Sequence, residues 1–187
     1  YPHEILHNWW GNGVFVDYAK GNWCEGLTAY LADYLIAENR GKGREYRMTT
    51  LQKYADYVSA GKDFPLTAFR SRHSSASEAV GYGKALMFYH MLRNSVGDEN
   101  FRKALRDFYA ANKFRYASFA ELRSAFEKYT GGGRLAGFFS QWTERAGAPE
   151  LELKDVKLGP GLEGWDLQFT LAQKQAGAPY ALQVPAA

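Results

Sequence analysis

The sequence predicts a mainly α-helical fold followed by a short β segment. Apolar side chains recur every three or four residues over most of the first three quarters of the chain, as on the buried face of a helix. Gly, Asp and Ser stand where several of these runs begin or end. After Gly147 the pattern changes to an alternation of apolar and polar residues, which is typical of strands.

Helices are expected in this order: HEILHNWW (3–10), CEGLTAYLADYLIAENRG (24–41), EYRMTTLQKYADYVSAG (45–61), SEAVGYGKALMFYHMLRNSVG (77–97), ENFRKALRDFYAAN (99–112), a helix opened by SFAEL (118–122), and LAGFFSQWTERAG (135–147). Gly41 follows the last apolar residue of the second run and is expected to end it. Asp98 is expected to cap the fifth helix. Ser118 and Glu121 have the spacing of a capping box, in which each side chain bonds the other residue's backbone N–H.

Three short alternating runs follow Gly147: LELKDVKL (151–158), GWDLQFTLAQ (164–173) and PYALQVP (179–185). We expect them to be strands at the start of a β-domain, because so few strands leave an open sheet face that needs cover. The expected division is a helical part over 1–147 and the beginning of a truncated, β-sandwich-like domain over 148–187.

Composition excludes some function classes for these 187 residues. A formal net charge of +3, without a dense run of Lys or Arg, does not favour nucleic acid as a partner. No apolar stretch is long enough to span a bilayer. The single cysteine, Cys24, excludes an internal disulfide and is expected to be a small, partly buried side chain. Cellular location and oligomeric state stay open.

The first residues carry the pattern HExxH. His3 and His7 are four positions apart, so on a helix they lie one turn above each other and can reach one ion. Glu4 is rotated to the side, where its carboxylate can address a water on that ion without occupying a coordination site. This is the arrangement of zinc hydrolases, although the pattern arises by chance in roughly one chain of this size in a hundred or more. The alternative is a pair of surface histidines beside a solvated glutamate.

Glu25 is the natural third ligand for a hydrolytic site, which needs three protein ligands and an open position. It begins the second helical run, after a connection that contains Gly11, Gly13 and Gly21. A glutamate at a helix start is usually a surface residue that the helix dipole favours. Here the flanking Trp23 and Leu27 are expected to draw that turn into the core.

Together, HEILHNWWGN and NWCEGLTAYL resemble the gluzincin aminopeptidases, the family of membrane alanyl aminopeptidase and leukotriene hydrolase. The segment VGYGKALMFYHMLRNSVGDENFRKALRDFY is similar to the family's Tyr-x-Lys-Gly helix and the part that follows, with Ala85 in place of the last glycine. The segment LAGFFSQWTERAGAPELEL resembles the family's exit into its β-domain. The resemblance implies the helical C-terminal part of a thermolysin-like zinc peptidase domain.

The resemblance also implies the site. His3, His7 and Glu25 match the ligands of one zinc ion, Glu4 matches the general base, and Tyr82 matches the tyrosine that stabilises the tetrahedral intermediate. A phenol is a sensible donor to a developing oxyanion. Without the resemblance, Tyr82 would be read as one more aromatic residue of a Tyr-rich core.

The function that follows is zinc-dependent hydrolysis of peptide bonds, with aminopeptidase activity implied by the family alone and peptides as partners. Endopeptidase activity stays open, and epoxide hydrolysis is a less favoured chemistry on the same scaffold. The rival interpretation is a non-catalytic interaction module or an inactive fragment. We expect a fragment, because His3 would otherwise lie in a fraying first turn.

The other histidines are not expected to bind metal. His90 is read as a helix residue, and His73 lies in the polar loop SRHSSAS. Arg70 and Arg72 of this loop could meet the carboxylate of a peptide, but solvated loop charges are the favoured reading.

Overall fold

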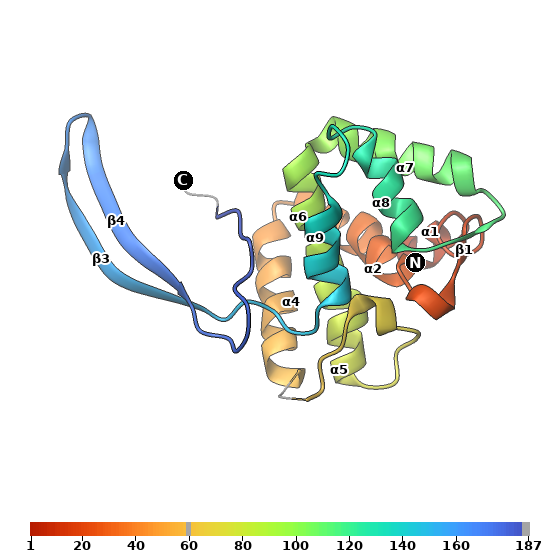
Figure 1. Ribbon diagram of the computed structural model, residues 1–187, viewed down its shortest axis with the longest axis horizontal. Coiled ribbons are helices and arrows are strands. Elements are labelled where there is room, and N and C mark those ends of the chain that lie inside the picture. The colour runs from red at the N-terminus through yellow and green to blue at the C-terminus, as the bar shows by residue number, and fades with distance from the viewer. Residues whose placement is uncertain (59–60, 185–187) are drawn as a thin grey trace. The chain divides into compact units, whose positions relative to one another are not determined.

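The computed structural model describes residues 1–58 and 61–184, and the chain divides into two compact units, Tyr1–Ala146 and Gly147–Ala187. The first unit is helical and the second holds a two-stranded sheet, so the predicted fold class is confirmed (Figure 1). Within the described part of the chain, no helix combines the length and the apolar character needed to cross a membrane.

Helices make up most of the first unit. The α-helices are α1 (Pro2–Leu6), α2 (Cys24–Thr28), α3 (Leu35–Asn39), α4 (Gly43–Tyr57), α5 (Ser75–Glu78), α6 (Ala85–Val96), α7 (Asp98–Asn112), α8 (Phe119–Glu127) and α9 (Ala136–Phe139). Short 3₁₀ turns lie at η1 (Tyr18–Lys20) and η3 (Leu66–Ala68). Each expected helical run therefore contains a helix, and the last residues of the third run, 59–60, lie outside the described residues.

Three of the expected helices contain a π-helical segment. Segment η2 (Ala29–Tyr34) joins α2 to α3, segment η4 (Ala79–Lys84) joins α5 to α6, and segment η5 (Ser140–Glu144) extends α9. A π-turn holds one more residue than an α-turn, so it rotates the side chains that follow it around the helix. The periodicity of apolar residues did not predict these segments.

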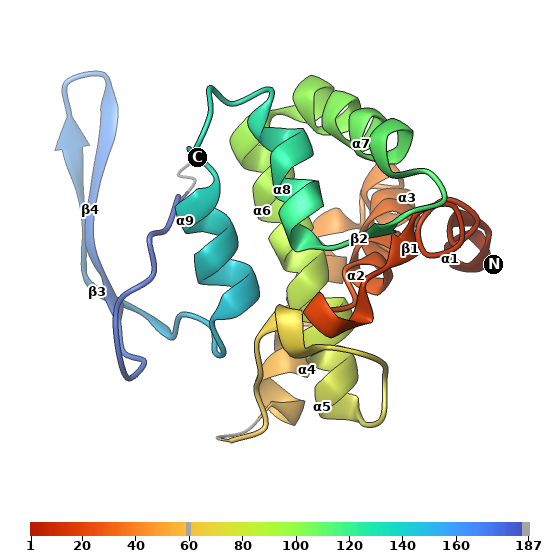
Figure 2. The same cartoon turned by 45° about the vertical axis from the view of Figure 1, so that its right-hand side comes forward.

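Aromatic rings make up a large part of the core of the first unit. Trp23 and Phe108 meet edge to face with ring centroids 5.0 Å apart, and Trp10 stacks on Phe108 at 6.2 Å. The indole N–H of Trp23 donates to the carbonyl of Ala117 at 2.7 Å. That bond ties the start of α2 to the short strand β2 (Tyr116–Ala117), which pairs in parallel with β1 (Phe15–Val16) (Figure 2).

Two predicted helix starts have different outcomes. The capping box is confirmed: the Ser118 hydroxyl accepts from the backbone N–H of Ala120, and the Glu121 carboxylate accepts from the backbone N–H of Ser118 at 2.8 Å. The cap at Asp98 is wrong, because Gly97 holds the N-cap position and Asp98 is the first helical residue. The Asp98 carboxylate instead accepts from the Arg93 guanidinium at 2.7 Å.

The second unit is a hairpin of β3 (Leu151–Gly161) and β4 (Gly164–Gln173), paired antiparallel with an irregularity between Lys154 and Lys157. The third expected strand is wrong over 179–184, where no strand forms, and Pro185 lies outside the described residues. Tyr180 is buried, and its backbone bonds the Gln173 side chain on both sides, at 2.7 and 2.8 Å. These bonds take the place of a strand ladder, to which Pro179 has no N–H to offer.

Candidate metal centre

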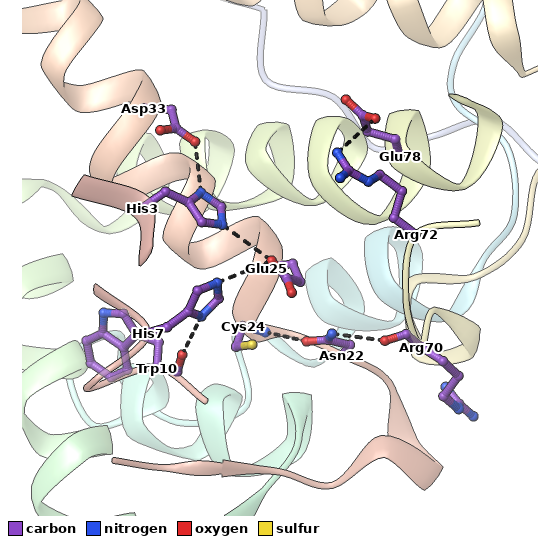
Figure 3. Close-up of polar contacts among 10 residues, drawn as sticks. All are labelled: His3, His7, Trp10, Asn22, Cys24, Glu25, Asp33, Arg70, Arg72 and Glu78. Carbon is purple, nitrogen blue, oxygen red and sulfur yellow. Dashed lines mark hydrogen bonds and ion pairs between the residues drawn. The ribbon is translucent and has the colours of Figure 1, made fainter. Parts of the chain in front are cut away.

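The side chains of His3, His7 and Glu25 converge on one point of the first unit (Figure 3). His3 lies in α1, His7 follows its last residue, and Glu25 lies in the first turn of α2. The Nε2 atoms of both histidines lie 3.4 Å from Oε2 of Glu25. One nitrogen or oxygen atom from each of the three residues lies within 4.8 Å of the other two.

This geometry fits a zinc ion. A tetrahedral ion with bonds of about 2.0–2.2 Å separates its ligand atoms by roughly 3.3–3.6 Å. Two imidazoles and one carboxylate are also a donor set of catalytic zinc sites, which keep a fourth position open. The cluster faces a cleft of about 560 Å³, so a fourth position would be accessible from solvent.

The Nδ1 atom of each imidazole, which faces away from the convergence point, has a hydrogen-bond partner. Nδ1 of His3 lies 2.9 Å from Oδ2 of Asp33, and Nδ1 of His7 lies 2.9 Å from the carbonyl oxygen of Trp10. A carboxylate and a carbonyl only accept hydrogen bonds, so each Nδ1 is the donor and each Nε2 lone pair is free to face a cation. Such partners of the distal nitrogen orient metal-binding histidines.

The π-helical segment η2 explains why Asp33 reaches His3. Asp33 is eight residues after Glu25, and on an unbroken α-helix this spacing would rotate the two side chains about 80° apart. Segment η2 begins after Glu25 and contains Asp33, and its wider turn, with about one more residue than an α-turn, brings the two side chains back toward one face. Glu25, Ala29 and Asp33 all line the cleft as a result.

Close packing of two helices fixes the turn that carries Glu25. A Cβ added at Gly26 would overlap the Cβ of Ala85 in α6, so only glycine allows this approach. The Tyr89 hydroxyl, also from α6, donates to the carbonyl of Trp23 at 3.0 Å. Cys24 is buried, as expected, and burial raises the pKa of its thiol, which therefore stays protonated.

Glu4 lies beside the cluster and not within it. Its side chain is exposed and lines the same cleft as both histidines. Glu4 therefore belongs to the cleft but is not one of the three residues that converge.

Tyr82 lines the cleft from segment η4, and its ring is stacked near that of His3 with centroids 6.1 Å apart and planes 19° apart. The Phe69 ring meets it from another side at 6.0 Å. Burial and then the negative charge of Glu25 raise the pKa of the Tyr82 phenol, so it carries its proton and can donate a hydrogen bond. The structure thus brings the five predicted site residues to one cleft, while their roles stay predictions.

Other cleft residues were not predicted as part of the site. Asp33 is the clearest case. In the sequence it is only an acidic residue in the predicted helix that contains Glu25, and nothing else marks it as part of the site. Arg72 was read as a solvated loop charge, yet it lines the cleft, with its guanidinium carbon 6.0 Å from the Tyr82 ring centroid. His73 bonds Ser71 in the loop, and His90 packs against Tyr34, where burial lowers its pKa to about 4.

Sequence comparison finds peptidases among similar proteins. The "Alanine/arginine aminopeptidase" of Saccharomyces cerevisiae is 26% identical over 164 residues, which cover 83% of this chain and 19% of that protein. "Aminopeptidase N" of Lactococcus lactis is 23% identical over 182 residues, covering 92% of this chain and 20% of the relative. The chain therefore spans about a fifth of the length of these relatives.

Solved structures are similar as well. The crystal structure of an M1 zinc metallopeptidase from Deinococcus radiodurans matches with a TM-score of 0.61 and 27% identity, over 79% of this chain and 33% of that one. An E323A mutant of the same organism's enzyme, bound to a Tyr-Ser-Ala substrate, matches over 80% of this chain with 26% identity. The family model "Peptidase family M1 domain" matches residues 2–142, which include the whole candidate metal centre, and the chain belongs to peptidase family M1.

Proposed function

We propose that the protein containing this chain is a zinc metallopeptidase that acts as an aminopeptidase. The observation that carries the proposal is the convergence of His3, His7 and Glu25 in a cleft that Glu4 and Tyr82 also line. Membership of the M1 family supports peptide hydrolysis as the activity and zinc as the bound metal. The preference for a free amino terminus is supported by the names of the relatives, which are aminopeptidases.

In this proposal the two imidazoles and the Glu25 carboxylate hold one zinc ion. When bound, zinc in such a site polarises a carbonyl group and lowers the pKa of water. Asp33 and the Trp10 carbonyl keep the two rings turned toward the ion. The close packing of Gly26 on Ala85 fixes the helical turn that carries Glu25.

Glu4 is the proposed general base. Its carboxylate takes a proton from the attacking water and later gives that proton to the nitrogen of the leaving amine. Glu4 lines the same cleft as the three proposed ligands, which supports this role. The group is exposed in the cleft, so substrate binding would remove water from around it.

Tyr82 is the proposed oxyanion donor. Its phenolic O–H would bond the carbonyl oxygen as negative charge develops there, and the ring is held between His3 and Phe69. Loss of one such donor costs about two to three orders of magnitude in kcat. The same residue would bond the ground-state carbonyl more weakly, so the effect falls on kcat more than on KM.

The domain division is also a proposal. We infer that residues 1–147 are the helical part of the catalytic domain and that 148–187 begin a β-sandwich-like domain. The separation of compact units at Ala146 and Gly147 and the hairpin in the second unit support it.

Substitution of Glu4 tests the mechanism in the full polypeptide that contains this chain. We expect Glu4→Gln to lower kcat on aminoacyl reporter substrates by at least about two orders of magnitude, with one zinc per chain retained by mass spectrometry. The matched control is Glu45→Gln, at an exposed glutamate of α4 outside the cleft, and this variant should keep wild-type turnover.

Unchanged turnover in Glu4→Gln would remove Glu4 from this role. Wild-type protein that holds no zinc would favour the non-catalytic interpretation. Cleavage of peptides with an acetylated amino terminus would indicate an endopeptidase.

A further inference from the structure

The cleft extends beyond the candidate metal centre, and two elements form this further part. Helix α4 contributes one face, with Tyr46, Thr50, Lys53 and Tyr57 at helical spacing. The loop before α5 contributes Arg72, and α5 itself contributes Ser75 and Glu78. None of these residues has a role in the proposed hydrolysis, so their chemistry is free to recognise the rest of a substrate.

Charge is distributed unevenly along this cleft. Glu4, Glu25 and Asp33 gather at the metal-binding end. Tyr46 lies close to Asp33. Burial, and then the negative charge of Asp33, raises the pKa of the Tyr46 phenol. Lys53 is seven residues further along α4, a distance of about 10 Å along the helix axis. The lysine therefore lies away from the acidic end.

Arg72 is a second cation of the cleft, and it lies within reach of a short peptide at the metal-binding end. Its guanidinium carbon is 6.0 Å from the Tyr82 ring centroid, and that centroid is 6.1 Å from the His3 ring centroid. The two distances together equal about three to four extended residues. Figure 3 shows Arg72 and Glu78 at a distance from the convergence point of His3, His7 and Glu25.

Neither cation is held in a strong ion pair. Arg72 pairs with Glu78 at 3.3 Å, but the two side chains are 59% and 44% exposed, and exposed pairs of this kind contribute little. Lys53 is exposed and makes no ion pair with any residue that the structure describes. A carboxylate of the substrate can therefore take the place of the Glu78 carboxylate on Arg72 at small cost.

We propose that Arg72, assisted by Lys53, is the receptor for a carboxylate of the peptide substrate. The inference rests on the proposed peptidase function and adds a substrate class to it, namely short peptides that place a carboxylate within a few residues of the scissile bond. The fork of an arginine binds a carboxylate through two parallel hydrogen bonds, whereas lysine adds a point charge. The carboxylate can belong to the C-terminus or to an acidic side chain.

Equilibrium binding separates this inference from turnover. Calorimetry on zinc-loaded Glu4→Gln protein, as the full polypeptide, would compare Ala-Ala-Ala, its C-terminal amide, and Ala-Asp-Ala amide. We expect the amide to bind about tenfold more weakly than the free acid, as the loss of a charge-assisted hydrogen bond predicts. Adding Arg72→Gln should reduce this ratio to less than about twofold, and Arg72→Lys should leave an intermediate ratio. The matched control Arg44→Gln, an exposed cation of α4 outside the cleft, should keep the tenfold ratio.

The binding ratios distinguish a C-terminal carboxylate from an acidic side chain, and some of them would overturn the inference. An acid-to-amide ratio that depends on Arg72 assigns the site to the C-terminal carboxylate. Equal binding of acid and amide, with tighter binding of the Asp peptide that Arg72→Gln abolishes, assigns it to an acidic side chain. Ratios unchanged by Arg72→Gln, ratios near one for every peptide, or no binding at all would overturn the inference. Failure of the proposed function appears separately, as no hydrolysis of any of the three peptides by zinc-loaded wild-type protein.

Discussion

The Asp33 carboxylate lies 2.9 Å from the nitrogen of His3 that faces away from the candidate metal position. A partner at this nitrogen fixes the tautomer and the orientation of the ring and raises its basicity as a ligand. Asp33 would therefore act on zinc through His3 without touching the ion. It has the same relation to His3 that the Trp10 carbonyl has to His7.

We expect Asp33→Ala to weaken zinc binding by about 10–100-fold, the usual cost of losing such a partner. Asp33→Asn should have a smaller effect, because its amide oxygen still accepts from Nδ1. Competition with a chelator of known affinity, in the full polypeptide, gives the dissociation constants. The control Asp56→Ala removes an exposed carboxylate of α4 outside the cleft and should leave the affinity unchanged. Equal zinc affinity in Asp33→Ala and wild type would show that the hydrogen bond does not orient His3.

At this scale the sequence predicted which side chains meet, and it missed what holds them. The spacing of His3 and His7 indicates a shared face directly, and the family resemblance points to Glu25 and Tyr82. Asp33 could not be found in the same way, because α-helical spacing places it off the face of Glu25. Only the extra residue of η2 brings it back.

Glycine at position 26 determines how closely α2 approaches α6. The family pattern has glycine where this chain has Ala85, and the Cβ of Ala85 occupies the space where a Cβ at position 26 would lie. The glycine after Glu25 is thus required by packing. Separation of the two helices would also move Glu25, which precedes it.

We expect Gly26→Ala to lower the free energy of unfolding by about 1–3 kcal/mol, because the core must shift to admit the methyl group. The control is Gly137→Ala in α9, where nothing lies within 4 Å of an added Cβ. That change should be neutral or stabilise by up to about 1 kcal/mol through helix propensity. Urea denaturation followed by circular dichroism measures both. Equal stability of Gly26→Ala and wild type would contradict the close approach.

Ser118 and Asp98, which both lie at helix starts, give a second comparison of stability. Ser118→Ala should destabilise by about 1 kcal/mol, because the Ser118 hydroxyl caps α8. Asp98→Ala should cost less, since Asp98 caps nothing and its pair with Arg93 is 59% exposed on the aspartate side. The same denaturation experiment ranks the two variants, and a larger effect at Asp98 would contradict the assignment.

Helices were more predictable than their interruptions and than the β segment. Apolar periodicity reports a buried face over many residues, so each helical run was found, but a single inserted residue in a π-turn changes that periodicity too little to detect. The run 179–185 alternates like a strand. Tyr180 is instead buried, and its backbone bonds the Gln173 side chain in place of a neighbouring strand, which no local pattern reveals.

The candidate metal centre links parts of the helical unit that are far apart along the chain. His3 and His7 lie at its beginning, Glu25 follows a connection of loops and short strands, and Tyr82 belongs to another helix. A ligand that binds only when these parts are assembled stabilises the folded state. The site is therefore expected to contribute to the stability of the unit as well as to catalysis.

Removal of zinc tests this coupling. At a free zinc concentration about a hundred times the dissociation constant, binding adds about 2.7 kcal/mol to the free energy of unfolding. For a cooperative folding unit of about 150–250 residues, that corresponds to a rise of about 5–10 °C in Tm, which a chelator should reverse. Thermal unfolding followed by far-ultraviolet circular dichroism measures both states. His7→Ala should abolish the zinc-dependent rise, whereas Glu4→Gln should keep it, because Glu4 lies outside the ligand cluster. A zinc-dependent rise that survives in His7→Ala would mean that the ion binds elsewhere, since two of the three ligands cannot retain it at the same affinity.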